Sequence, residues 1–87
     1  MRSLKDLLIA FFDMFTVKVV DSSTGRAVKG ARVSVGFDGF FRGFSNEEYT
    51  DSDGEVNFDN ENGEGTIYVN GQSKYRGYIS GRKVIYI

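Results

Sequence analysis

The first fourteen residues carry their apolar side chains at the spacing of an amphipathic helix. Apolar positions three or four residues apart form one continuous stripe, composed of Leu4, Leu7, Leu8, Phe11, Phe12 and Phe15. Ser3 and Asp6 have the three-residue spacing of a capping box. The pattern predicts an N-terminal amphipathic α-helix over residues 1–14, packed on a domain formed by residues 15–87.

From Phe15 onward the apolar positions recur every second residue, which is typical of half-buried β-strands. Polar and glycine-containing clusters with the composition of tight turns separate these segments. The pattern predicts strands near residues 15–19, 31–37, 49–50, 55–58, 66–69, 74–79 and 82–87, with turns at 21–25, 38–39, 51–54, 70–71 and 80–81. About seven short strands at this spacing indicate a mainly β fold, an antiparallel β-sandwich in a single domain.

The N-terminal stripe lacks the features of an export signal or a membrane span. Asp6 and Asp13 interrupt the apolar run, no small-residue cleavage site follows, and the run is too short to cross a bilayer. We therefore expect a cytoplasmic location by default. The stripe could cover an open face of the β domain or dock on a partner protein. A membrane surface is the weaker alternative, because the polar face has few cations.

The composition narrows the chemistry that this chain can perform. Its 87 residues contain no cysteine and no histidine, which excludes disulfides and thiolate metal sites and removes the commonest general base. We therefore expect no enzymatic activity and no cofactor. The formal net charge is −1, and no dense basic stripe is present, so we expect no nucleic-acid partner.

Acidic residues are concentrated between Ser45 and Ser73, where the sequence has no lysine or arginine. Within this stretch Asp51, Asp53 and Glu55 could offer oxygen ligands to calcium. A helix-loop-helix calcium loop is excluded, because the glycine comes at the fourth position instead of the sixth. We interpret these acids as turn and surface residues. A small-ligand module that binds calcium or a glycan through the acidic loops 47–64 is the alternative function.

Two segments, taken together, resemble a known family. The first covers residues 17–35 (VKVVDSSTGRAVKGARVSV), and the second covers residues 49–58 (YTDSDGEVNF) and is followed by GTIYV at 65–69. In this order they resemble carboxypeptidase regulatory-like domains and, more distantly, transthyretin-like (prealbumin-like) and collagen-adhesin B-type modules. The resemblance implies a Greek-key sandwich that serves as an adhesion, stalk, chaperone-like or appended domain.

Two activities found among these relatives do not carry over. The transthyretin-like hydrolases rely on histidine, which this chain lacks. The adhesin modules often carry a strand lysine that forms an internal cross-link. Lys18 lies one position further from the turn aspartate than that pattern requires, which places it on the opposite face of its strand.

The segment from Phe37 to Phe44 is the most unusual part of the sequence. Three phenylalanines within five residues cannot all point to one side of a strand, so at least one faces outward or the segment bulges. These rings either wrap over the core or form an exposed apolar patch for a partner protein. The leading hypothesis is a non-catalytic module for protein–protein interaction or assembly. Its candidate contacts are, in order of preference, Phe40, Phe41 and Phe44, and then Leu4, Leu8 and Phe11.

The tyrosines of the C-terminal half have a plainer interpretation. We expect Tyr68, Tyr75, Tyr78 and Tyr86 to form cross-strand aromatic pairs. A flat ligand platform would require both Tyr75 and Tyr78 to face outward. Neither the identity of a partner nor the oligomeric state follows from the sequence.

Overall fold

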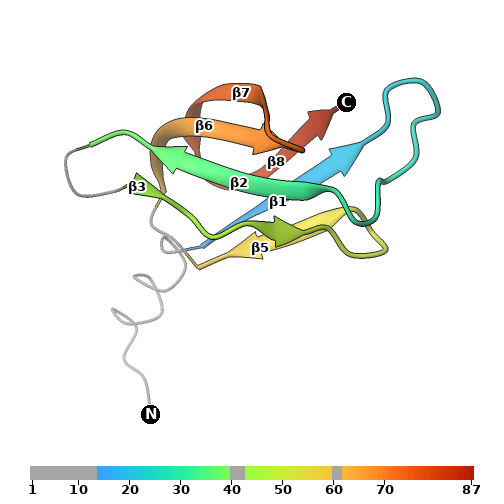
Figure 1. Ribbon diagram of the computed structural model, residues 1–87, viewed down its shortest axis with the longest axis horizontal. Coiled ribbons are helices and arrows are strands. Elements are labelled where there is room, and N and C mark those ends of the chain that lie inside the picture. Colours follow the sequence, from blue (N-terminus) through green and yellow to red (C-terminus); the bar gives the residue numbers. More distant parts are fainter. Residues whose placement is uncertain (1–13, 40–42, 60–61) are drawn as a thin grey trace, which may run out of the picture.

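The computed structural model describes residues 14–39, 43–59 and 62–87, which form two β-sheets (Figure 1). The mainly β fold predicted from the sequence is confirmed. The described residues contain no helix, and their strands are β1 (Phe15–Val20), β2 (Arg32–Phe37), β3 (Gly43–Phe44), β4 (Glu48–Tyr49), β5 (Glu55–Phe58), β6 (Gly63–Val69), β7 (Gln72–Ile79) and β8 (Gly81–Tyr86). The helix over residues 1–14 stays a prediction, because residues 1–13 lie outside the described ranges.

The first sheet has β1 at its centre, with β5 on one side and β8 on the other. β5 runs antiparallel to β1, with Phe58 opposite Phe15. β8 runs parallel to β1, with Gly81 opposite Phe15. The prediction of an antiparallel fold is therefore wrong for this pair of strands. Only Ser80 separates β7 from β8, and the chain passes there from one sheet to the other instead of forming a hairpin.

The second sheet has the order β3-β2-β6-β7, and the short β4 also pairs with β2, on the edge that β3 uses. β6 and β7 form a hairpin closed by Asn70 and Gly71, whose φ angles are 52° and 82°. A two-residue hairpin turn favours such left-handed angles at both positions, and Asn-Gly adopts them most easily. The turn predicted at 70–71 is confirmed. The turn predicted at 51–54 is also present, but it links β4 of this sheet to β5 of the other.

Alternate residues of both sheets point into one shared core. The buried apolar residues are Phe15, Val17, Val19, Val56, Phe58 and Ile85 on the side of the first sheet, and Ala31, Val33, Val35, Phe37, Ile67, Val69 and Ile79 on the side of the second. These inward positions are those that the two-residue period predicts for 15–19, 31–37 and 67–69. Removal of this apolar surface from water is the main favourable contribution to folding.

One end of the domain, which we call the turn end, is closed by the loops around residues 21–31 and 50–54 (Figure 1, right). Thr50 is buried there. Its hydroxyl donates to the carbonyl of Val28 (2.5 Å) and accepts from the N–H of Ala31 (2.9 Å). Because the hydroxyl both donates and accepts a hydrogen bond, its burial carries no large free-energy penalty. These bonds fasten residues 28–31 to the end of β4.

The first loop of the turn end is held by Asp21. Its Oδ1 accepts from the hydroxyl (2.6 Å) and the N–H (2.8 Å) of Ser23, and its carbonyl accepts from the N–H of Gly25 (2.8 Å). The hydrogen bonds from Ser23 favour the ionised carboxylate and lower the pKa of Asp21. Ser22 donates to the carbonyl of Ile87 through its N–H (2.8 Å) and its hydroxyl (2.9 Å). The chain that follows β8 is thereby tied to the same loop.

Candidate functional site at the aromatic end

The end of the domain opposite the turn end is the one where β1 begins and β2 and β5 end (Figure 1, left). Three phenylalanines pack together there, and we call it the aromatic end. The Phe15 ring stacks on the Phe58 ring at 5.3 Å between centroids and meets the Phe37 ring edge-on at 5.9 Å. Aromatic pairs favour both arrangements. Phe15 is the first residue of β1, whereas Phe37 and Phe58 are the last residues of β2 and β5. The three rings therefore join the two sheets where these strands begin or end.

An apolar cavity of about 730 Å³ lies beside these rings. The residues that line it come from the start of β1, the end of β5, the connection to β6 and the corner between β7 and β8: Met14, Phe15, Thr16, Asn57, Asp59, Asn62, Ser80 and Gly81. Met14 is 48% exposed, although the next residue, Phe15, is only 2% exposed. A cavity of this size is within the range of sites that bury a small organic molecule or a few side chains.

The rim of the cavity is polar, and two of its groups are bonded to each other. The Thr16 hydroxyl donates to Oδ1 of Asn57 at 2.6 Å, across the pair of strands β1 and β5. Among the residues that the structure describes, no three Asp, Glu, His or Cys side chains are close enough together to hold a metal ion. An apolar interior with a hydrogen-bonded polar rim suits the burial of apolar side chains.

Five of the six predicted contact residues lie outside the described residues. They are Leu4, Leu8, Phe11, Phe40 and Phe41. For Phe44, in β3, the structure describes the backbone, which pairs with that of Gly36 in β2. The two segments that contain these residues nevertheless join the fold at the same end. Residue 13 precedes Met14 in the cavity wall, and residues 40–42 connect the end of β2 to the start of β3. The attachment points of both predicted surfaces are therefore at the aromatic end.

An ion pair anchors the start of the connection between β2 and β3. Arg76 of β7 donates to both carboxylate oxygens of Asp38, with Nη1 2.8 Å from Oδ1, and Nη1 also contacts the Thr66 hydroxyl at 3.2 Å. The hydrogen bonds from Arg76 lower the pKa of Asp38, and the carboxylate raises the pKa of Arg76. Both side chains are largely exposed, so the pair adds little to stability. Its effect is to hold the chain beside β7 just before residues 40–42.

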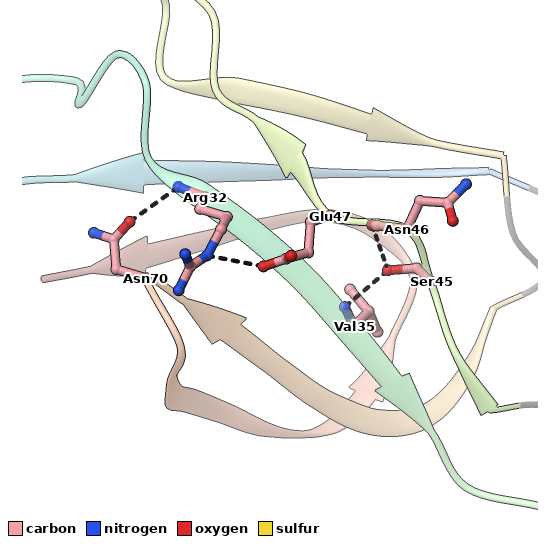
Figure 2. A network of polar contacts seen from close by, with 6 residues as sticks. All are labelled: Arg32, Val35, Ser45, Asn46, Glu47 and Asn70. Carbon is pink, nitrogen blue, oxygen red and sulfur yellow. Dashed lines mark hydrogen bonds and ion pairs between the residues drawn. The ribbon is translucent and has the colours of Figure 1, made fainter.

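Polar side chains cover the edge of β2 behind this connection (Figure 2). Between β3 and β4, Ser45 donates its N–H to the carbonyl of Val35 (2.8 Å) and accepts the N–H of Val35 on its hydroxyl (2.9 Å). Further along β2, Nε of Arg32 pairs with Glu47 (2.8 Å), and the N–H of Arg32 donates to Oδ1 of Asn70 (3.0 Å). The Ser45 bonds satisfy backbone groups of Val35 that the two short strands leave uncovered, whereas the Arg32 N–H is satisfied on the side of β2 that faces β6.

Two of the three acids that the sequence offered as calcium ligands, Asp51 and Glu55, have partners within the domain. Oδ1 of Asp51 accepts from the N–H groups of Asp53 and Glu55, each at 2.9 Å, and its carbonyl accepts from the N–H of Gly54 at 2.9 Å. The carboxylate of Glu55 forms an ion pair with Arg82 of β8 at 2.6 Å. Asp51 therefore stabilises its own turn, and Glu55 links two strands of the first sheet.

Tyr75 and Tyr78 do not form a flat platform. Tyr75 is half-buried, on the side of Ile67, and the Lys83 ammonium lies 5.1 Å from its ring centroid. Its hydroxyl donates to the carbonyl of Tyr78 (3.0 Å), whereas the Tyr78 side chain is exposed. The two rings therefore differ in direction, and the arrangement that a ligand platform requires is not present.

The cavity at the aromatic end had no signal in the sequence. Its walls come from four separate segments, and only the pairing of β1 with both β5 and β8 brings Thr16, Asn57 and Gly81 together. Within the described ranges no helix is long and apolar enough to cross a membrane. No family model matches the sequence, and no curated protein is significantly similar to it.

Proposed function

We propose that the protein is a non-catalytic β-sandwich module for protein–protein interaction or assembly, on the Greek-key plan of carboxypeptidase regulatory-like and transthyretin-like domains. The proposed contact surface is the aromatic end, with Phe40, Phe41 and Phe44 as the first contacts. One observation carries the proposal: the two phenylalanine-containing segments 1–13 and 40–42 join the fold at the end that has the apolar cavity.

The core of the aromatic end is rich in aromatic side chains. The described core already contains three phenylalanines at this end, packed against one another. Aromatic side chains that are surplus to a core are the usual anchors of protein interfaces, and charged residues are depleted from the centres of such interfaces. At the turn end the exposed aromatics Tyr49 and Tyr86 lie on different sheets, so they form no comparable cluster.

The chemistry of the chain supports a binding role. Activation of a hydroxyl or amine nucleophile requires a neighbouring base or a shifted pKa. Histidine and cysteine are missing from the sequence, and Asp38, Asp51 and Glu55 are engaged in ion pairs or in a turn. Two polar groups of the cavity rim, Thr16 and Asn57, are bonded to each other.

Site-specific photo-crosslinking in the full chain tests the proposal. A photoreactive amino acid at position 42 lies within the connection from β2 to β3, and one at position 86 lies at the turn end. We expect a discrete cross-linked protein, either a partner or a second copy, from position 42 and none from position 86. Replacing Phe40 and Phe41 with Ser should abolish that product, because the apolar anchors are removed.

The matched control replaces Tyr49 and Tyr86 with Ser, two exposed aromatic residues of the turn end. It should leave both the cross-link and the melting temperature unchanged. If the Phe40→Ser/Phe41→Ser variant instead unfolds, those rings belong to the core. If the variant stays folded and the cross-link persists, the aromatic end is not the contact surface.

A further inference from the structure

The strands β7 and β8 are the edges of the two sheets on one side of the sandwich, and only Ser80 separates them. Among the described strands, β7 pairs with β6 alone and β8 pairs with β1 alone. An edge strand presents unpaired backbone N–H and C=O groups to which another strand can bond, so native proteins protect such edges. The two edges on this side differ in how they are protected.

The edge of β7 is irregular. The register between β6 and β7 shifts between Ile67 and Tyr68, as it does at a β-bulge. Lys74 adds an exposed charge to the same strand. A bulge twists an edge away from a partner strand, and an exposed lysine opposes pairing by its charge and hydration. We therefore expect β7 to be a poor template for strand addition.

The edge of β8 is regular and apolar. All six of its residues pair with β1 without a register shift. Residues 84–87 read Val-Ile-Tyr-Ile, a run of strong strand formers without proline. Val84 is 43% exposed and Tyr86 is 64% exposed, on the side of the strand away from the core. A segment of this kind at a sheet edge is a favourable template for an identical strand.

Lys83 is the residue of β8 that departs from this pattern. It lies opposite Val17, whose side chain is fully buried, so Lys83 starts on the core side of the sheet and not on its outer face. Lys83 is half-buried, and its ammonium lies 5.1 Å from the ring centroid of Tyr75 in β7. The side chain therefore spans the open side of the sandwich from one edge strand to the other.

A strand added to the edge of β8 would enclose this ammonium. Three ion pairs form among the residues that the structure describes, and Lys83 takes part in none of them. Its charge is therefore stabilised by the Tyr75 ring and by water on the open side. An added strand would exclude that water, and burial of an ammonium without a carboxylate partner is costly. Inward-pointing charges keep sheet edges unpaired in this way.

We propose that the edge of β8 is a pairing surface for the same strand of a second copy of the chain, and that Lys83 keeps this edge unpaired. A second copy is the fitting partner, because a symmetric antiparallel pair sets the run of Val84, Ile85 and Tyr86 against itself. Cross-strand pairs of β-branched and aromatic side chains are favourable. This proposal does not depend on the contact surface proposed at the aromatic end.

Substitutions at Lys83 in the full chain test the proposal. Lys83→Met keeps a long apolar side chain and removes the charge, whereas Lys83→Arg keeps both the charge and the contact with an aromatic ring. The matched control is Lys29→Met, which makes the same change of charge at an exposed position of the turn end. Sedimentation equilibrium measures the dissociation constant of the dimer for each chain, and urea denaturation verifies that each chain is folded.

We expect Lys83→Met to dimerise at least about a hundredfold more tightly than the native chain, because the cost of enclosing the charge is removed. Lys83→Arg and Lys29→Met should stay within about threefold of the native chain, since both leave a charge at the edge of β8. If Lys83→Met does not fold, the uncharged but polar Lys83→Gln replaces it. That variant should dimerise at least about tenfold more tightly than the native chain.

Introduced thiols locate the contact, because the sequence has no cysteine. Val84→Cys on β8 and Asn57→Cys on β5, the other edge of the first sheet, are each combined with Lys83→Met, or with Lys83→Gln if that variant replaces it. Side chains that face each other across paired strands are about 5 Å apart, within reach of a short bifunctional maleimide. The Val84→Cys chain should therefore form a covalent dimer much faster than the Asn57→Cys chain.

Three results would overturn the proposal. A folded Lys83→Met or Lys83→Gln variant that is no more dimeric than the native chain would show that Lys83 does not hold the edge unpaired. Equal dimerisation of Lys83→Arg, or of Lys29→Met, would show that the charge at this position is not what matters. Equal rates of cross-linking from positions 84 and 57 would place the contact away from β8.

Discussion

At the turn end, the loops that close the domain are held by Thr50, Asp21 and Asp51, each of which accepts hydrogen bonds from backbone N–H groups. At the aromatic end the corresponding position is taken by three packed rings and a cavity of about 730 Å³. The turn end satisfies its own polar groups and needs no further chain. The aromatic end offers apolar surface, which is non-directional and can be covered by any complementary apolar partner.

This difference separates stability from recognition within one small domain. Hydrogen bonds at the turn end have fixed directions and specify one loop arrangement. Apolar burial at the aromatic end depends mainly on area, so it tolerates variation in what covers it. Substitutions at the two ends should therefore differ in size and in kind.

The largest expected effect is at the aromatic end. Phe15→Ala removes the ring that contacts both Phe37 and Phe58, and should lower the free energy of unfolding by about 3–5 kcal/mol. Urea denaturation of the full chain measures this value. Tyr86→Ala, at an exposed position of the turn end, should change it by no more than about 0.5 kcal/mol. A loss below about 1 kcal/mol for Phe15→Ala would show that the rings do not hold the sheets together.

Replacing either of two glycines of the turn end with alanine should lower stability by an intermediate amount, and the two substitutions can be compared directly. Gly25 and Gly54 both have φ of 73°, so Ala at either position incurs a left-handed backbone penalty of about 1–2 kcal/mol. A Cβ at Gly54 would also lie 2.7 Å from the carbonyl oxygen of Val19, whereas at Gly25 nothing lies within 4 Å. Gly54→Ala should therefore destabilise the domain by at least about 1 kcal/mol more than Gly25→Ala, as measured by urea denaturation. Equal losses would contradict the close approach of the turn to β1.

Substitutions at two threonines compare the buried hydrogen bonds of the turn end with the more accessible one at the cavity rim. Thr50→Val leaves the carbonyl of Val28 and the N–H of Ala31 without this partner in a buried place, and should cost about 1–3 kcal/mol. Thr16→Val breaks a bond to Asn57 at the more accessible cavity rim, where water can replace the hydroxyl, and should cost about 0.5 kcal/mol. Both are read from chemical denaturation. If Thr16→Val costs as much as Thr50→Val, the two ends do not differ as described.

The smallest expected effect is a pH dependence at the aromatic end. Because Arg76 lowers the pKa of Asp38 below its ordinary value of 3.8, the ion pair stabilises the fold above that pH. This contribution is lost as the pH falls through the lowered pKa. The melting temperature of the native chain should exceed that of Asp38→Asn at neutral pH, and the difference should vanish in strong acid and shrink in high salt. A difference that grows toward acid would contradict the assigned pair.

The alternation of side chains determined much of the fold in advance. It placed Val17, Val33, Val35 and Ile67 in the core, because a strand with one buried face must present every second residue to it. The turn at Asn70-Gly71 was equally predictable from its required backbone angles. These features depend on residues that are close together in the chain.

Features that depend on distant residues were not predictable from the sequence. Alternation gives the face of a strand but not its neighbour, so the parallel pairing of β8 with β1 had no signal in the pattern. The pair Asp38–Arg76 joins positions 38 residues apart, and the cavity brings Thr16 beside both Asn57 and Gly81. The sequence singled out the segments 1–14 and 40–44. That both segments connect to the same end of the domain could be known only from the strand pairing.

Amide hydrogen exchange of the full chain, compared with that of the Phe15→Leu variant, tests directly whether the packed rings hold the aromatic end independently of the turn end. Our interpretation predicts faster exchange for amides that border the cavity, such as those of Thr16 and Asn57. The amides of Gly30 and Ala31, which are bonded to Thr50 at the turn end, should keep their protection. Equal acceleration at both ends, or none at either, would contradict it.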